Sequence, residues 1–356
     1  MKFAVIGAGN GGQAIAGYLA MSGQEVNLYN RTPDVIESLK QIGGITLKGV
    51  LNGYGIPKLF TTDIKEAINE CEIIMIATTA VAHRTLAVKL AKYLKDSQII
   101  ILNPGRTGGA LEFKQALVTA GCTRRVYIAE AQTLLYACRI ISPGIVNIIG
   151  IKDFVYISAL PSSDTDYVLE KLQPVFPCFA KAESVIRTSL GNVGAVFHPC
   201  VLLFNAATIE RQHEFYFYRD MTEQVGQFIE QFDTERLNVG KAFGIQLMSV
   251  NEWISKSYPT TKGITLCEKM KNNPAYYDIK SPSSIYTRQL MEDIPTGVLP
   301  ILELGKIVGL KMPLHESMFN MVSALLDIDF MKDGRSLKNL GLAGKTKEEI
   351  IDYLTN

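Results

Sequence analysis

The stretch MKFAVIGAGNGG, residues 1–12, decides the fold of this chain. Lys2 to Ile6 predicts a short buried strand, and Gln13 to Met21 predicts a helix. Between them stand glycines at the spacing G-x-G-x-x-G. Such glycines allow a tight turn, a close backbone approach to a pyrophosphate and close packing of the helix on the strand. The stretch therefore predicts the first strand–turn–helix unit of a dinucleotide-binding domain.

The start of this helix is suited to phosphate because its first backbone N–H groups are unpaired and its dipole places partial positive charge there. A glycine-rich turn can also form without a ligand. Here the glycines stand directly between a strand and a helix, which is the context that cofactor binding requires. We therefore expect the loop to contact the cofactor through these residues: Gly7, Gly9, Asn10, Gly11 and Gly12.

The end of the second predicted strand, Glu25 to Tyr29, indicates which dinucleotide fits. A site for NAD usually carries Asp or Glu there, to bind the ribose 2′-hydroxyl, but this chain continues with Asn30-Arg31-Thr32. A carboxylate would repel a 2′-phosphate, whereas Arg31 could pair with one. The sequence therefore predicts NADP as the preferred cofactor. NAD stays usable if Arg31 only stacks on the adenine or remains in solvent.

Length, charge and hydropathy limit the class of protein. The chain has 356 residues, which predicts two domains, and 47% of them are apolar, enough to fill sizeable cores. A formal net charge of +1 argues against binding nucleic acid by neutralising phosphates. No apolar run reaches the ~18 residues of a membrane span, and the first strand runs straight into the glycines, unlike a signal peptide. We expect no nucleic-acid or membrane partner.

The cysteines indicate the compartment. The six cysteines are scattered along the chain and include no C-x-x-C pair. This spacing predicts reduced thiols in a cytoplasmic protein, and it does not predict a disulfide framework or a zinc site. We therefore expect no bound metal.

Strands and helices alternate up to about residue 185, which predicts a mostly parallel sheet covered on both faces. Residues 45–61 interrupt the alternation as a short hairpin insertion. Thr78 and Thr79 follow a strong buried strand, at the end that faces the ligand in open α/β sheets, so we expect them to contact ribose or nicotinamide. The loop 103–109 follows the next buried strand on the same side, and Arg106 is interpreted as a loop charge.

From about Thr188 the pattern becomes helical, with a long amphipathic helix predicted over Met221 to Phe243. The predicted fold class is α/β, a Rossmann-type doubly wound sheet followed by an all-α domain. We assign residues 1–185 to dinucleotide binding and residues 186–356 to the helical substrate and catalytic domain. The site is expected in the cleft between them, where ligand pockets often form.

Two clusters in the helical half carry residues that could do chemistry. His198 lies in an apolar stretch, with Gly194 one turn before it and Pro199 after it. Such a lone histidine is most often a core residue. Arg288 and Asp293 form the second cluster; five residues apart, they would not share one face of a continuous helix. With Asp293 at a helix end before Pro295, both could still point into a cleft, but from these residues alone a solvated charged turn is the favoured interpretation.

Taken in order, several motifs resemble the opine dehydrogenase family of the octopine/nopaline type, and the resemblance covers nearly the whole chain. The motifs are the glycine loop, Asn103-Pro104-Gly105…Gly108-Gly109, Tyr136-Ala137-Cys138-Arg139, Gly191-Asn192…His198-Pro199, Tyr218-Arg219, Asp233…Glu235-Arg236, Ala275-Tyr276 and Arg288…Glu292-Asp293-Ile294-Pro295-Thr296-Gly297. The His-Pro motif and the last motif are the specific ones, because many dehydrogenases share the glycine loop.

The resemblance implies a reductive condensation, in which an amino acid and a 2-oxo acid form an imine that NAD(P)H reduces. It also implies the residues: His198 as general acid/base, Asp293 holding it, Arg288 on a substrate carboxylate and Asn192 in substrate binding. These roles suit the chemistry, since an imidazole titrates near neutral pH, a carboxylate fixes its tautomer and a guanidinium binds a carboxylate with two hydrogen bonds. The expected partners are these small molecules and a second copy of the chain in a homodimer.

Two alternatives stay open. An NADP-dependent reductase of the ketopantoate or glycerol-3-phosphate type resembles this chain in its N-terminal half. Such enzymes use a catalytic lysine on the second-domain helix, and there is no lysine between Val193 and Glu210. A non-catalytic NADP-binding sensor would keep the glycine loop and lose the catalytic cluster, which is intact here. The residues name neither the amino acid nor the oxo acid.

Overall fold

The computed structural model describes all residues, Met1–Asn356, and it begins with the predicted strand–turn–helix unit. β1 (Lys2–Ile6) leads through the glycine loop into α1 (Asn10–Met21). Gly7 has a φ of +106°, which favours glycine, and a Cβ on Gly12 would lie 1.7 Å from the Gly7 carbonyl oxygen. Nothing lies within 4 Å of a Cβ built on Gly9. Gly7 therefore allows the turn, Gly12 allows close packing of α1 on the loop, and Gly9 leaves the backbone open to a ligand.

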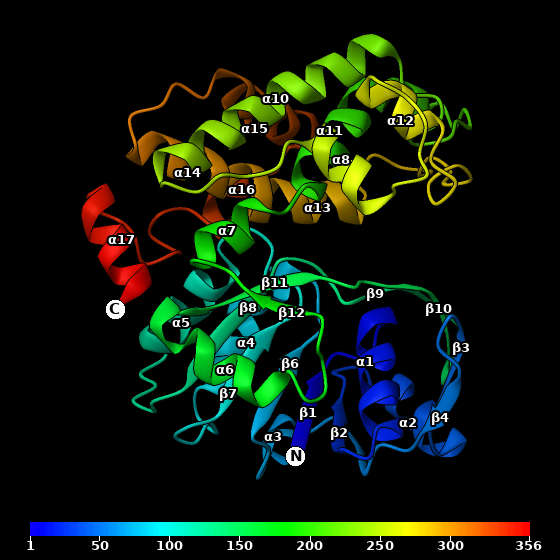
Figure 1. Ribbon diagram of the computed structural model, residues 1–356, viewed down its shortest axis with the longest axis vertical. Coiled ribbons are helices and arrows are strands. Elements are labelled where there is room, and N and C mark those ends of the chain that lie inside the picture. Colours follow the sequence, from blue (N-terminus) through cyan, green and yellow to red (C-terminus); the bar gives the residue numbers. More distant parts are fainter. The chain divides into compact units, whose positions relative to one another are not determined.

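An eight-stranded sheet organises this part of the chain. Its order is β12 (Phe179–Lys181), β11 (Val155–Leu160), β8 (Tyr127–Ala131), β7 (Ile99–Leu102), β6 (Ile73–Ile76), β1, β2 (Glu25–Tyr29) and β5 (Leu59–Thr61). Neighbouring strands are parallel except β8 and β11, which are antiparallel. The carboxyl ends of β1, β6, β7 and β8 consequently meet at one edge of the sheet, where the glycine loop lies (Figure 1).

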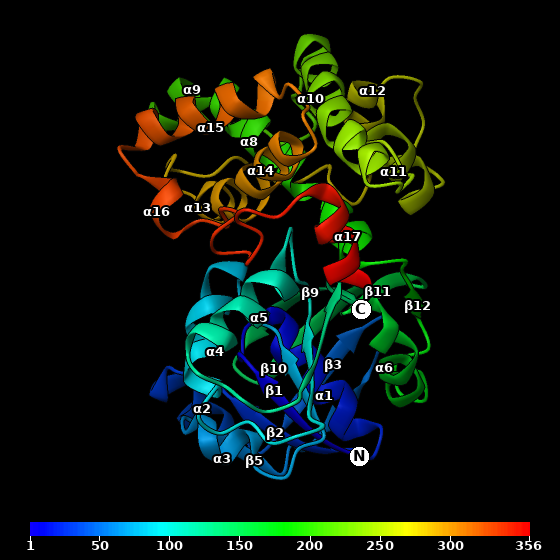
Figure 2. The same ribbon diagram turned by 90° about the vertical axis from the view of Figure 1, so that its left-hand side faces the viewer.

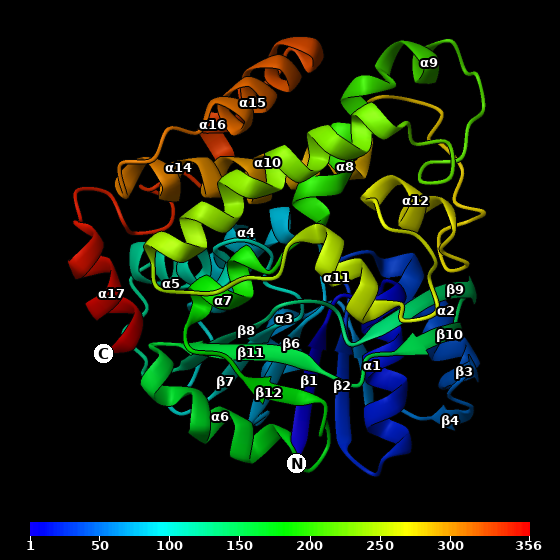
Figure 3. The ribbon, with the colours of Figure 1, turned by 45° about the horizontal axis from the view of Figure 1, so that its top comes forward.

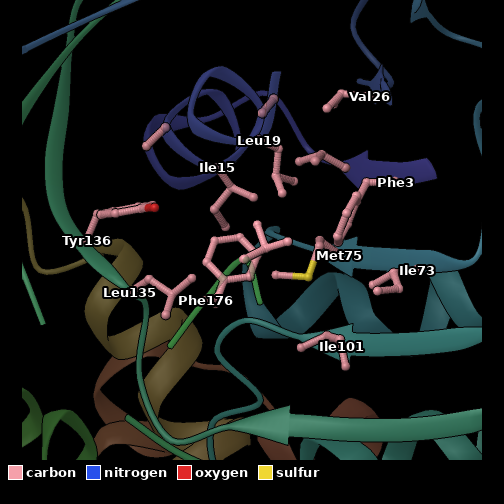
Figure 4. Packing of buried hydrophobic residues seen from close by; sticks show 14 of the residues in the cluster. Phe3, Ile15, Leu19, Val26, Ile73, Met75, Ile101, Leu135, Tyr136 and Phe176 are labelled. Carbon is pink, nitrogen blue, oxygen red and sulfur yellow. The ribbon is translucent and has the colours of Figure 1, made fainter. Parts of the chain in front are cut away.

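Helices cover both faces of this sheet. α4 (His83–Leu90) and α5 (Gly109–Thr119) pack side by side on one face (Figure 2). α1 and α6 (Thr165–Leu172) share a buried apolar cluster with the other face (Figure 3). Figure 4 shows Ile15 and Leu19 of α1 pointing toward Phe3 and Met75 of the strands. The short helices α2 (Pro33–Ile42), η1 (Ala80–Ala82), α3 (Ile64–Ile68) and η2 (Ser162–Asp164) complete the connections.

A second sheet of four strands packs beside α1, and here the structure differs from the expectation of one sheet. β3 (Ile45–Gly49) and β4 (Gly53–Gly55) form the predicted hairpin. β10 (Ile145–Ile151) pairs with β3 and β9 (Tyr136–Ser142) pairs with β10, in the order β4-β3-β10-β9, instead of extending the main sheet. The reason is the alternation of burial along β9 and β10, which suits a sheet with only one covered face.

The second half of the chain is helical, which confirms the predicted fold class. Its elements are α8 (Gly194–Phe204), α9 (Ala206–Glu210), α10 (Glu223–Ala242), α11 (Val250–Ser257), α12 (Leu266–Lys271), α13 (Arg288–Asp293), the π-helix η3 (Ile294–Val298), α14 (Leu299–Ile307), α15 (Pro313–Leu326) and α16 (Phe330–Asp333). α10 packs against α8, α12 and α14 (Figure 1). None of the helices combines the length and hydropathy needed to cross a bilayer.

Two buried polar pairs stabilise the helical part. The fully buried Arg236 pairs with Asp233 (Nε–Oδ1 2.6 Å) and donates to the carbonyl oxygens of Leu190 and Met248. His315, also fully buried, contacts Glu235 through Nδ1 (2.7 Å to Oε2), and its ring stacks on a phenylalanine. Because each charge has a partner, these groups can stay in the interior. Burial nevertheless lowers the pKa of His315.

The chain divides into two units with slightly different bounds from those predicted. The first comprises Met1–Ser189 together with Ile351–Asn356, and the second comprises Leu190–Ile350. The expected division after residue 185 thus lies four residues early. The last six residues, which we had placed with the helical domain, belong to the nucleotide unit, because Tyr353 of α17 (Lys347–Thr355) packs there with its ring 4.7 Å from the Lys114 ammonium. α7 (Val185–Leu190) ends at the division between the units.

Candidate functional site

The helical unit brings together the two residues expected to form a catalytic pair. His198 lies in the second turn of α8, and Asp293 is the last residue of α13. The distance from His198 Nδ1 to Asp293 Oδ2 is 2.6 Å. Asp293 is 1% exposed, whereas His198 is half-buried. The ring of Phe217 contacts the imidazole edge-on, at 6.1 Å between centroids. The geometry is that of a carboxylate holding an accessible imidazole.

Gly297 explains how α8 approaches Asp293 so closely. α13 continues directly into η3, which contains Pro295 and Gly297. A Cβ on Gly297 would lie 2.5 Å from the Cβ of Ala195, one turn before His198 on α8. Only glycine therefore permits this separation between α8 and η3. Asn192 is buried at the same contact, with Nδ2 3.8 Å from that Cβ position.

The electrostatics of the pair favour proton transfer through one nitrogen. A carboxylate at Nδ1 favours the tautomer with the proton on Nδ1, which leaves the lone pair of Nε2 to accept a proton. The buried Asp293 charge also influences its neighbour Tyr218, whose pKa is raised mainly by burial and further by this carboxylate. Tyr218 thus stays a neutral hydroxyl, and a carboxylate at Nδ1 is placed to stabilise an imidazolium.

Arg288 stands at the start of α13 and points to solvent. Its side chain is 61% exposed, and Nη1 pairs with Glu292 Oε2 at 2.8 Å, one helical turn on. Glu292 is buried, so it can hold one side of the guanidinium while the other nitrogens remain able to donate. Sequence reasoning missed Glu292 as a partner, although the i,i+4 spacing signals it.

The glycine loop lies between β1 and α1, at the carboxyl end of β1. The Asn10 side chain accepts a hydrogen bond from the Ile140 N–H (2.8 Å), and Leu134 packs against Gly11. This hydrogen bond fixes the Asn10 side chain through its oxygen, and the backbone N–H of Asn10 stands at the start of α1, where helix N–H groups are available to a phosphate. Asn30, after β2, accepts from the Ala8 N–H of the loop at 3.2 Å, and the next residue, Arg31, is exposed.

Unpartnered polar atoms fit a dinucleotide along the same edge of the sheet. Thr78 Oγ1 and both side-chain polar atoms of Asn103 are buried without a hydrogen-bond partner. Thr78 lies two residues beyond the end of β6, and Asn103 directly follows β7; these are the two strands next to β1 on the side away from β2. Thr79 is exposed beside Thr78. Buried polar groups without a partner are costly, so these atoms and the open space at Gly9 are consistent with a ribose and nicotinamide.

A buried carboxylate that sequence reasoning did not single out holds the loop after β7. Glu130 is fully buried and accepts hydrogen bonds from Ala110 N (2.7 Å), Thr188 Oγ1 (2.6 Å) and Ser189 Oγ (2.7 Å). A Cβ on Gly105 would lie 2.6 Å from the Cβ of Glu130. Asn103 is consequently fixed at the sheet edge. A polar residue at the end of a buried strand was the one signal that could have revealed Glu130.

Comparison with known families agrees with both halves of the structure. The family described as NAD/NADP octopine/nopaline dehydrogenase, alpha-helical domain, matches residues 181–326. The N-terminus of NAD-dependent glycerol-3-phosphate dehydrogenase matches residues 2–116. The second match reflects the resemblance expected for the N-terminal half, and the first covers the segment that carries His198 and Asp293.

Individual relatives extend the match to the whole chain. The opine dehydrogenase of Arthrobacter sp. (strain 1C) is 39% identical over 346 residues, which cover 97% of this chain and 96% of that protein. The solved octopine dehydrogenase with NADH and L-arginine has a TM-score of 0.84 at 21% identity, over 99% of this chain and 98% of that one. NADP⁺-bound yersinopine dehydrogenase has a TM-score of 0.72 at 14% identity, covering 99% and 97%. The chain therefore belongs to the opine dehydrogenase family of the octopine/nopaline type, a family of NAD(P)-dependent oxidoreductases.

Proposed function

We propose that this opine dehydrogenase condenses an amino acid with a 2-oxo acid and reduces the resulting imine, with His198 as general acid/base. The observation that carries the proposal is the 2.6 Å contact between His198 Nδ1 and the buried Asp293. The solved octopine dehydrogenase has been crystallised with NADH together with L-arginine, agmatine or pyruvate in separate structures. Those ligands are of the amine and oxo-acid classes that the proposal requires.

The chain's residues account for the protons of the condensation. The substrate amine is an ammonium ion at neutral pH, so it must lose a proton before it attacks the oxo-acid carbonyl. His198 Nε2 accepts that proton, and the imidazolium then returns it to the departing hydroxyl, which leaves as water. Asp293 stabilises the imidazolium between the two steps. When bound, the nicotinamide supplies the hydride that reduces the imine carbon.

Arg288 and Asn192 complete the substrate contacts in this proposal. Arg288 binds the carboxylate of the oxo acid with the guanidinium nitrogens that Glu292 does not occupy. This contact fixes the carbonyl for attack, which lowers the entropic part of the barrier. Asn192, at the contact between α8 and η3, binds the substrate next to His198.

A crossed substrate screen tests the reaction. NADPH oxidation is measured for each amino acid with pyruvate, oxaloacetate, 2-oxoglutarate and glyoxylate, and each component is then omitted in turn. We expect oxidation only when both substrates are present, and a product whose mass equals their sum less one oxygen atom. Oxidation with an oxo acid alone would refute the condensation and favour a hydroxy-acid reductase.

The preference for NADP over NAD belongs to the same proposal. Arg31 is exposed beyond the end of β2, and the residue before it is the neutral Asn30, whose amide is held by the glycine loop. We expect Arg31→Ala to weaken NADPH binding about 10- to 100-fold, since a charge-assisted hydrogen bond contributes about 1.5–3 kcal/mol. NADH binding should change little, as should both affinities in the exposed control Lys40→Ala. Equal losses for both cofactors would refute the 2′-phosphate contact.

We further propose a cytoplasmic homodimer. All six cysteines are free thiols, which supports a reducing compartment. Light scattering of the purified protein tests the assembly, and a mass equal to one chain would refute the dimer.

A further inference from the structure

A pocket in the helical unit is not used by the proposed mechanism. It has a volume of about 190 Å³ and lies between the end of α8, residues 215–222 and the start of α10. Its apolar lining consists of Val201, Phe204, Phe215, Phe217, Met221 and Val225. These residues belong to the same unit as His198 and Asp293, Leu190–Ile350. The pocket and the His198–Asp293 pair are therefore parts of one folded body.

Two contacts place this pocket next to His198. Phe217 is buried and lines the pocket, and its ring meets the imidazole edge-on, with 6.1 Å between the centroids. Val201 follows His198 by three residues on α8, which is about 4.5 Å along the helix axis and on nearly the same side of the helix. A molecule bound at the imidazole consequently has the pocket within the length of an amino-acid side chain.

The backbone explains why two phenylalanines face the pocket. The Phe217 N–H donates to the Ile279 carbonyl oxygen (2.7 Å) within a short antiparallel bridge, so this segment is extended. Alternate side chains of an extended segment point in the same direction. Phe215 and Phe217 therefore both line the pocket, whereas the ring of Tyr216 between them contacts the Arg219 guanidinium, whose carbon lies 3.2 Å from the ring centroid.

Two neutral polar residues of the lining already have hydrogen bonds to the backbone. Thr222 is the N-cap of α10, and its hydroxyl oxygen accepts from the Val225 N–H at 3.3 Å. The Asn205 amide donates to the Val201 carbonyl oxygen at 2.9 Å. Because these groups serve the helix ends, the favourable contribution of the pocket to binding is the removal of apolar surface from water.

The one charged residue of the lining, Asp220, is also engaged. Its Oδ2 accepts from the Tyr216 N–H at 2.7 Å, and its Oδ1 lies 3.9 Å from Arg219 Nε. The carboxylate is exposed as well, so water screens its charge. A cationic ligand would gain little from a carboxylate that already has a hydrogen bond and a neighbouring guanidinium. The charges therefore favour an uncharged occupant.

We propose that this pocket binds the side chain of the amino-acid substrate and selects apolar side chains of the size of leucine or phenylalanine. The inference rests on the proposed function, because it requires the substrate nitrogen at the His198 imidazole. The side chain begins two bonds from that nitrogen, so it can lie against Phe217 and extend into the pocket. An apolar cavity of about 150 Å³ holds benzene, and the volume here is sufficient for these side chains.

A series of amino acids of increasing size tests the pocket. Initial rates of NADPH oxidation are measured for L-alanine, L-valine, L-leucine, L-phenylalanine and L-lysine with the oxo acid that gives the highest turnover. We expect the wild-type kcat/KM to rise about fourfold for each carbon added between L-alanine and L-leucine, as expected for a buried methylene group. L-lysine should be a poorer substrate than L-leucine.

Filling the pocket should remove this preference. Val225 is half-buried in the first turn of α10, and Val225→Phe should raise the KM for L-leucine and L-phenylalanine about 10- to 100-fold. The KM for L-alanine, the KM for the oxo acid and the Kd for NADPH should stay within about twofold. The exposed control Val118→Phe should behave as wild type. Val225→Leu, with a smaller effect on the same two substrates, replaces the phenylalanine variant if that protein does not fold.

The outcomes separate this inference from the proposed function. Equal KM increases for L-alanine and L-leucine would mean a structural role of Val225, and an unchanged KM for L-leucine would place its side chain elsewhere. A wild-type preference for L-lysine that Asp220→Asn removes would assign the pocket to a cation. Each of these results overturns the inference while condensation by the wild type stands. Wild-type enzyme without condensation activity would refute the proposed function itself, and the pocket assignment with it.

Discussion

Replacing Asp293 with Asn removes a charge from the His198 pair and keeps its shape. The contact is 2.6 Å long and the carboxylate is 1% exposed, so solvent screens it little. A hydrogen bond to a charged group contributes about 1.5–3 kcal/mol. Coulomb attraction between an imidazolium and a carboxylate 4 Å apart is about 4 kcal/mol at an effective dielectric constant near 20. Since each ~1.4 kcal/mol is a factor of ten, kcat should fall by about 10- to 10³-fold.

Stability should respond differently from activity. Burying a carboxylate is costly, so its neutral amide can leave the free energy of unfolding unchanged or even increase it. We expect Asp293→Asn to keep its melting temperature while it loses turnover, and the exposed control Asp278→Asn to keep both.

The double variant His198→Ala/Asp293→Asn gives the sharpest assay. If Asp293 acts through the imidazole, the double variant should be no slower than His198→Ala alone, which should lose about 10²- to 10⁴-fold. Losses that multiply in the double variant would refute the reasoning, as would turnover by Asp293→Asn within threefold of wild type in condensation assays at saturating substrates.

Three further predictions test the scaffold. Gly297→Ala should lower the free energy of unfolding by about 1–3 kcal/mol in urea titrations because its methyl group would overlap Ala195, and adding Ala195→Gly should restore most of the loss. His315 is buried and its pKa is lowered, so as the pH falls the unfolded chain binds a proton at this histidine before the folded chain does. The free energy of unfolding should therefore be unaffected by His315 above about pH 6.5 and should decrease as the pH falls below that value. His315→Gln should remove this pH dependence. Gly9→Ala should reduce NADPH affinity in fluorescence titrations without lowering the melting temperature. Gly12→Ala should lower both, because only its methyl group would overlap the backbone, at the carbonyl oxygen of Gly7. Equal melting temperatures for the two glycine variants would contradict this difference.

Local pattern was sufficient for the first strand–turn–helix unit of the nucleotide half. Strand, glycines and helix are adjacent along residues 1–21, so sequence spacing fixed their geometry directly. The pairing of β10 with β3 was not predictable in this way, because it joins segments about a hundred residues apart through one-sided burial. A strand pattern reveals that a strand exists, but not which partner covers it.

The helical half depended on the resemblance to a family. His198 and Asp293 are separated by 95 positions, and nothing in either segment alone specifies their contact. The close approach of Gly297 to Ala195 and the π-helix around it likewise arise from tertiary packing.

The π-helix between α13 and α14 allows the direction of Asp293 and the buried side of α14 to be set independently. A regular α-helix would link the two. Each residue of an α-helix turns the chain by ~100°, so the direction of Asp293 would otherwise dictate which side of α14 meets the interior. The wider turn of η3 takes up one residue more and uncouples the two directions. Deleting a single residue within Ile294–Val298 would therefore rotate the acid away from its histidine, or else turn the apolar side of α14 into water. The length of this segment is therefore as strict a requirement as the glycine at position 297.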